Sequence, residues 1–72
     1  MRDFTIRQGD GFIKLGQLLK AEGLVDTGAD AKFSIEKGET SVNGEVCTLR
    51  GRKIKDGDEV SFRGETIRVH GS

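Results

Sequence analysis

Side chains that could act as a nucleophile and its base are few in this sequence. Cys47 is the only cysteine, and the only histidine, His70, lies close to the end of the chain. A nucleophilic mechanism needs a Ser, Cys or Thr within hydrogen-bonding reach of a base, and side chains near chain ends are often mobile. Cys47 lies in a strand pattern, where a small buried thiol is the ordinary interpretation. The sequence therefore predicts that the protein is not an enzyme.

Residues that could hold a metal ion or a cofactor are equally sparse. The acids Asp56, Asp58 and Glu59 surround one turn, whereas a calcium loop spaces its oxygen ligands over about twelve positions. One His and one Cys cannot form a zinc site of soft ligands within one chain. Gly9 and Gly11 lack the third glycine of a dinucleotide-binding fingerprint. We expect no metal, no cofactor and no small-molecule substrate.

Cations are concentrated in one short segment. Residues 50–55 (RGRKIK) contain four cations within a connector, 50–58, for which the pattern predicts no regular structure. Residues 46–72 carry six basic and four acidic side chains, whereas residues 1–45 carry six basic and eight acidic ones. Long cationic side chains on a loop can reach phosphates, and guanidinium groups bind them bidentately. The other interpretation is a solvated surface.

Two further cations lie on predicted helices. Lys14 lies at or near the start of the first helix, whose first turn has no acid. Free helix N–H groups beside Lys14 would suit a phosphate, unless the helix begins earlier and is capped by Asp10. Lys32 lies at the border of the buried face of the second helix, where it either contacts a phosphate or serves solubility, paired with Glu36.

The elements that must position these side chains are short. Alternating residues predict a strand over 4–6, followed by a turn over 8–11. Leucine spacing predicts a helix over 14–22 that ends at Gly23, and Thr27 with Asp30 predicts a capped second helix that ends at Gly38. Ala31 and Ile35 share the buried face of that second helix.

Strands follow the second helix. The segments 40–42 and 45–49 flank Asn43-Gly44, a strong hairpin signal, and the segments 59–63 and 66–70 flank a turn near Gly64-Glu65. The pattern predicts an α+β fold in which two short helices pack on a small, curled, mostly antiparallel sheet of four to five strands.

Length and composition limit the class of protein. The chain has 72 residues, of which 33% are apolar and 33% charged, so we expect a single domain with a thin core. Twelve basic residues balance twelve acidic ones, which argues against a polycation that binds by bulk charge. No apolar run is long enough for a membrane span or a signal peptide. We expect a cytoplasmic monomer that does not contact membranes.

Taken in order, these motifs resemble the S4 RNA-binding domain, a family named after ribosomal small-subunit protein four. The matching residues are Leu15, Leu18-Leu19, Gly23-Leu24, Thr27, Ala31-Lys32, Ile35, Gly38, Val42-Asn43-Gly44-Glu45 and Gly57-Asp58-Glu59-Val60. They cover about residues 13–62, the core called the alpha-L motif, and the remaining residues of 1–72 add flanking strands. Residues 49–54 are similar to short bacterial members that consist of little more than this domain.

The resemblance implies a non-enzymatic module that docks structured RNA, either ribosomal or transfer RNA, and that could join the ribosome. In this family the two helices and the following loop form a basic surface. On the matching positions, together with the charge run, the implied RNA-binding residues are Lys14, Thr27, Lys32, Arg50, Arg52, Lys53 and Lys55. We expect these cations to converge into one patch that faces away from the acids.

One position departs from the family pattern. Where many members have the second of two adjacent cations, this chain has Phe33. Phe33 either packs against the added strand 4–6 or stacks on an unpaired base. A protein-interaction module is an alternative to RNA binding, because it suits the mixed charge. One version of it, a ubiquitin-like sulfur carrier, needs a terminal Gly-Gly, which this chain lacks. A further alternative, duplex DNA binding, lacks a long recognition helix.

Overall fold

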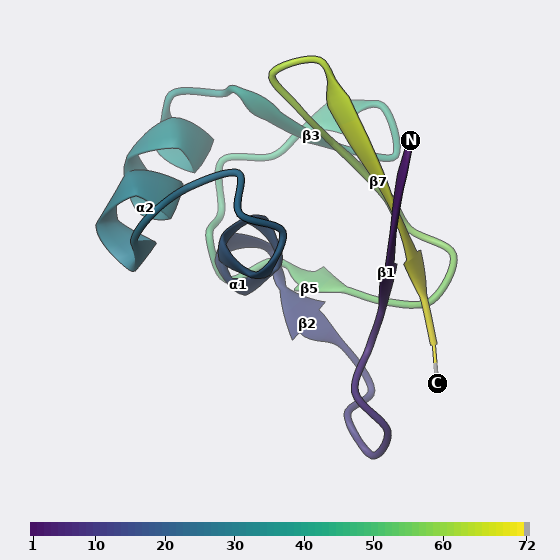
Figure 1. Cartoon of the computed structure of the whole chain (residues 1–72). Coiled ribbons are helices and arrows are strands. Elements are labelled where there is room, and N and C mark those ends of the chain that lie inside the picture. The colour runs from purple at the N-terminus through teal and green to yellow at the C-terminus, as the bar shows by residue number, and fades with distance from the viewer. Residues whose placement is uncertain (72) are drawn as a thin grey trace.

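Nine short elements are formed by residues 1–71, the part of the chain that this computed structural model describes. In chain order they are β1 (Arg2–Thr5), β2 (Ile13–Lys14), α1 (Leu15–Ala21), α2 (Gly28–Glu36), β3 (Thr40–Val42), β4 (Glu45–Val46), β5 (Lys53–Ile54), β6 (Glu59–Phe62) and β7 (Glu65–His70). Both helices lie on one side of the sheet, and the ribbon of β2 and β5 lies beside α1 (Figure 1). In this part of the chain, neither helix is long and apolar enough to cross a bilayer.

Both helices form close to the predicted positions, because their end signals are local. α1 follows Lys14 as its N-cap and is followed by Gly23, whose φ of 72° suits a glycine. Thr27 caps α2, and its Oγ1 accepts a hydrogen bond from the Asp30 N–H at 3.1 Å. Since α1 begins at Leu15, the alternative in which Asp10 caps an earlier start is wrong.

The main sheet has five strands in the order β1-β7-β6-β3-β4, and this confirms the predicted α+β class. All neighbours are antiparallel except β1 and β7, which run parallel. Asn43 and Gly44, at φ 52° and 86°, form the two-residue turn between β3 and β4. Several boundaries differ from the prediction, and β1 spans Arg2–Thr5 instead of residues 4–6. β4 ends at Val46, and the β6–β7 turn has its positive φ values at Arg63 and Gly64, one residue early.

A second sheet has two strands, and one of them, β5, lies within the connector for which no regular structure was predicted. β5 pairs antiparallel with β2, so that Ile13 faces Ile54 and Lys14 faces Lys53. Two-residue strands contain too little alternation to be recognised from sequence. The pairing matters because Ile54 is fully buried, and this anchors the cationic segment to the start of α1.

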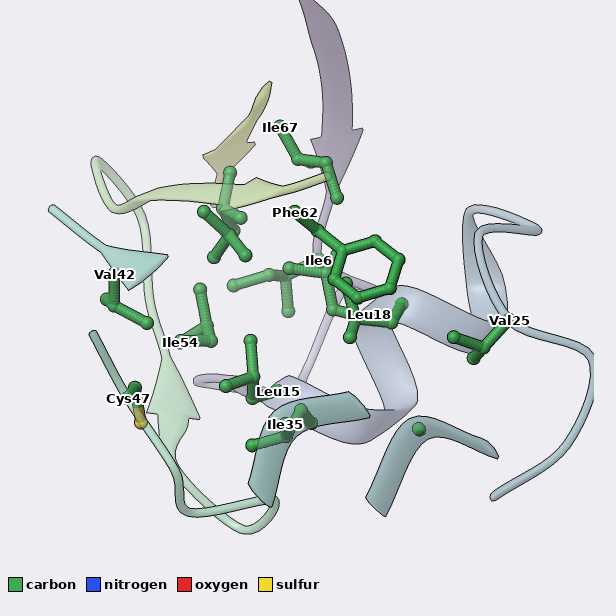
Figure 2. Packing of buried hydrophobic residues seen from close by; sticks show 14 residues of the cluster. Ile6, Leu15, Leu18, Val25, Ile35, Val42, Cys47, Ile54, Phe62 and Ile67 are labelled. Carbon is green, nitrogen blue, oxygen red and sulfur yellow. The ribbon is translucent and has the colours of Figure 1, made fainter. Parts of the chain in front are cut away.

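The core lies between the helices and the inner face of the main sheet. Leu15 and Leu18 of α1, Ile35 of α2, Ile54 of β5 and Phe62 of β6 point toward one another (Figure 2). All five side chains are at most 2% exposed. Helix α1 is therefore held from three sides, by α2, by the ribbon and by the sheet.

Phe33 is not part of this core. Its side chain is 63% exposed, so the interpretation that it packs against the added strand is wrong. The added strand instead packs through Ile6, which follows β1 and is buried, and through the half-buried Phe4. Ile6 also donates its N–H to the carbonyl oxygen of His70 at 2.8 Å.

An arginine at the β6–β7 turn connects the sheet to α2. The Arg63 guanidinium donates to both carboxylate oxygens of Glu39, at 2.9 and 3.1 Å, and to Ser34 Oγ at 3.2 Å. The hydrogen bond from Arg63, assisted by its charge, holds the pKa of Glu39 below its ordinary value. This ion pair therefore links folding stability to pH.

We expect Glu39→Gln to lower the midpoint of thermal unfolding at neutral pH and to have no effect in strong acid. The Glu39 pKa is lower in the folded than in the unfolded chain. The stability it contributes is therefore complete above the ordinary glutamate pKa and is lost as the pH falls through the lower folded pKa. Melting curves of both proteins across this pH range check the prediction. An equal penalty at every pH would contradict it.

Candidate nucleic-acid interface

Two lysines face each other across the small ribbon. Lys14 of β2 and Lys53 of β5 are directly opposite partners in the antiparallel pairing, and both side chains are exposed. Like charges in this arrangement destabilise a strand pair. An anion bound between the two ammonium groups would remove this repulsion, so the ribbon favours a negatively charged ligand.

The cationic connector is fastened to the first turn of α1 through its backbone. The N–H of Leu15 donates to the carbonyl oxygen of Arg52 at 2.8 Å, and that of Gly16 donates to the carbonyl oxygen of Arg50 at 3.0 Å. These bonds show that the expectation of free helix N–H groups at this end was wrong. Lys14 lies at the helix start as predicted, but any phosphate there would be bound by side chains.

Gly16 allows Arg50 to lie against the helix. A methyl group at Gly16 would come within 2.7 Å of Arg50 Cγ, closer than carbon atoms approach without displacement. Because Gly16 has no side chain, the aliphatic part of Arg50 can cross the first turn of α1. The position of the Arg50 side chain therefore depends on a glycine in another element.

A cleft of about 410 Å³ opens between α1, α2 and the connector. Three cations, Lys14, Lys20 and Arg50, are among its lining residues, and no carboxylate is. Gln17 also lines it, and its side-chain oxygen accepts the Lys14 N–H at 3.4 Å. We call Lys14, Lys20, Arg50 and Lys53 the basic face, since the cleft and the ribbon bring these four together.

Ion pairs separate the cations of this protein into two groups. Within residues 1–71, the arginines paired to carboxylates are Arg2, Arg63 and Arg68, all on the main sheet or its turns, with N–O distances between 2.6 and 3.9 Å. In the same part of the chain, no cation of the basic face has a carboxylate within 4.0 Å. The cations of the basic face are therefore available to bind an external anion.

The other predicted RNA-binding residues lie outside the cleft. Arg52 is exposed between Gly51, which lines the cleft, and Lys53. Lys32 is exposed and follows Ala31, another lining residue of the cleft. The Thr27 hydroxyl is used for capping. Lys55 is exposed in the next turn, where its backbone N–H donates to Asp58 at 2.8 Å. Of the predicted residues, Lys14 and Arg50 line the cleft, whereas Thr27, Lys32, Arg52, Lys53 and Lys55 do not.

Phe33 lies apart from the basic face. Lys37 Nζ is 5.0 Å from the centre of its ring. The hollow that Phe33 lines also contains Asp26 and Asp30, whose charges would repel a phosphate backbone. Stacking of a base on Phe33 stays a prediction, and its surroundings do not favour it.

Two features of the basic face were missed in the sequence. Lys20 follows Lys14 and Gln17 at three-residue steps, a spacing that places side chains along one edge of a helix. This spacing can be recognised from the sequence alone. The approach of Arg50 to Gly16 joins residues 34 positions apart in the chain, and no local pattern announces such a contact.

The fold and the site together define a small α+β domain whose two-helix corner carries cations without ion-pair partners. A family model described as the S4 domain matches residues 4–70. The chain therefore belongs to the S4 domain family, and the resemblance seen in the sequence is confirmed.

Several known proteins are similar to this chain. The "Putative RNA-binding protein YbcJ" of Escherichia coli (strain K12) is 42% identical over 57 residues, which are 79% of this chain and 81% of that protein. The "Probable ribosome maturation protein RlbA" of Bacillus subtilis (strain 168) is 40% identical over 52 residues, 72% of this chain and 73% of the other.

The solution structure of E. coli YbcJ has the same fold. It covers 97% of this chain and 87% of its own, with a TM-score of 0.71 and 37% sequence identity. That structure is described as revealing an alpha-L motif involved in RNA binding. The two-helix corner predicted here under the same name is therefore shared with a solved relative.

Proposed function

We propose that this protein is a non-enzymatic module that binds structured RNA by holding phosphate groups on its basic face. The observation that carries the proposal is the cleft lined by Lys14, Lys20 and Arg50 without a carboxylate. The neutral net charge does not oppose it, because none of the residues that line this cleft is acidic, and Glu39, Glu59 and Glu65 pair with arginines of the main sheet and its turns. The relatives named for RNA binding support the same conclusion.

In this proposal, binding depends more on where the phosphate groups of the RNA lie than on its base sequence. Phosphate contacts orient a protein on RNA but carry little sequence information. The rigid corner of α1 and the ribbon holds the basic face, and Arg52, Lys55, Lys32 and the Thr27 hydroxyl extend its contacts. Most of the affinity should then be electrostatic, as expected for displaced counterions.

We further propose ribosomal RNA as the ligand, in the cytoplasm, with the protein acting as a monomer. The B. subtilis relative carries the name of a probable ribosome maturation protein, and this favours ribosomal over transfer RNA. Crosslinking in cell lysate followed by sequencing of the attached RNA tests the proposal. We expect ribosomal RNA to be enriched. Enrichment of transfer RNA would correct the ligand, and recovery of protein partners without RNA would overturn the function.

Gly16→Ala is expected to weaken RNA binding severalfold. The new methyl group would displace the Arg50 side chain from the first turn of α1, although alanine is the better helix former by about 1 kcal/mol. Filter binding measures the loss, and circular dichroism confirms that the helices remain. As a control, Gly16→Ala should add little in an Arg50→Gln background. A full additional loss there would show that Gly16 acts independently of Arg50.

A further inference from the structure

An aromatic ring lies beside the basic face and has no role in the phosphate contacts. Phe12 precedes β2 and is 37% exposed. Lys53 Nζ, a member of the basic face, lies 4.9 Å from the centre of the Phe12 ring. The contact is a cation–π interaction, and it places an apolar planar surface next to an ammonium group that is proposed to bind phosphate.

Two hollows meet at Phe12. One, of about 310 Å³, lies between β1 and α1 and has an apolar floor that includes Phe4, Ile6 and Ile13. The other, of about 410 Å³, extends past Phe12 to Lys14. Both hollows are lined by Phe12, Asp10 and Gln17, so an apolar recess continues directly into the cationic ribbon.

The chemistry of this recess identifies the part of a nucleotide that fits it. A phosphate fits poorly at the floor, because Phe4, Ile6 and Ile13 offer it no donors and the carboxylate of Asp10 would repel it, although Arg7 also lines this hollow. A nucleobase fits each feature. Its flat face can stack on Phe12, a contact that is typical of unpaired bases bound to aromatic side chains. Its amino group can donate to Asp10, which has no ion-pair partner within residues 1–71, and the Gln17 amide can bond the base edge.

We propose that Phe12 is the stacking platform for an unpaired nucleobase of the RNA whose adjoining phosphates lie on the basic face. The inference rests on the proposed function. It adds that the preferred ligand contains unpaired nucleotides in a loop or bulge, since a base in a continuous helix cannot leave its stack without cost. It also assigns stacking to Phe12 in place of Phe33.

The test compares two hairpin RNAs and one fully paired RNA that contain the same stem. In the first the loop consists of adenosines, in the second the loop nucleotides are abasic, and in the third RNA the strands are fully paired without a loop. The two hairpins share the whole phosphate backbone and differ only in their loop bases, and the paired RNA shares the backbone of the stem. We expect the wild-type protein to bind the adenosine-loop RNA about tenfold more tightly than the other two.

Phe12→Leu keeps an apolar side chain but removes the aromatic face. We expect this variant to lose the preference for the adenosine loop while its affinity for the abasic and paired RNAs changes less than about twofold. Phe33→Leu, the matched control, should retain the full preference. Thermal unfolding of both variants confirms that they fold.

Every other result would contradict either the stacking assignment or the proposed function. An equal loss on all three RNAs for Phe12→Leu, or a wild-type protein without any preference, would overturn the stacking assignment and leave phosphate binding intact. Loss of the preference in Phe33→Leu instead would move the stacking site to α2. A wild-type protein that binds none of the three RNAs at low salt would overturn the proposed function together with this inference.

Discussion

Replacing Arg50, Arg52 and Lys53 together by glutamine is expected to weaken RNA binding tenfold or more. Their segment is fastened to α1 by the hydrogen bonds to Leu15 and Gly16, so its side chains are held where the cleft and the ribbon meet. Each lost phosphate contact also removes one displaced counterion, and the loss should be largest at low salt. Filter-binding titrations of wild type and variant at several salt concentrations measure the effect.

A charge-matched control is available among the arginines of the main sheet and its turns. Substituting Arg2, Arg63 and Arg68 by glutamine changes the net charge by the same amount, but these arginines are paired to carboxylates on the main sheet. We expect this control to bind RNA nearly as well as the wild type. Equal losses in the two triple variants would mean that bulk charge, and not the basic face, determines affinity.

The largest effect on stability is expected from Leu18→Ala. Leu18 is fully buried at the centre of the core, between α1 and the sheet (Figure 2). Truncation of a leucine at such a site costs about 2–5 kcal/mol, whereas a chain of this length is stable by only about 4–11 kcal/mol. Urea unfolding followed by circular dichroism measures the change in the free energy of unfolding.

Leu49→Ala provides the same chemical change at the surface. Leu49 follows the hairpin and is 68% exposed, so the free energy of unfolding should change by no more than about 0.5 kcal/mol. Since the ribbon and α1 share the core with Leu18, RNA binding should fall with the folded fraction of Leu18→Ala. Similar costs for the two substitutions would contradict the core described here.

The parts of the fold that the sequence predicted are those with local signals. Thr27 with Asp30 announces the start of α2, Gly23 the end of α1, and Asn43-Gly44 the first hairpin. Each is a backbone preference that acts within a few residues and needs no knowledge of the rest of the chain. The observed strand ends differ from the predicted ones by one to three residues, because the exact end of a strand depends on its pairing with other strands.

The parts that could not be predicted depend on contacts between distant segments. The pairing of β2 with β5 brings Lys14 against Lys53, and the crossing of Gly16 by Arg50 completes the cleft. Neither contact has a local signature. The prediction that helix N–H groups are free at Lys14 failed for this reason, because their acceptors are carbonyl groups of residues 50 and 52.

The slope of RNA affinity against salt tests phosphate binding by the basic face most directly. About four cations without carboxylate partners, each releasing one counterion, predict that log K falls against log salt concentration with a slope near −3 to −4. The measurement is a filter-binding titration of the wild-type protein with a structured ribosomal RNA fragment. A slope in this range is the expected result. A slope near zero would contradict the account, because binding would then not involve phosphate groups.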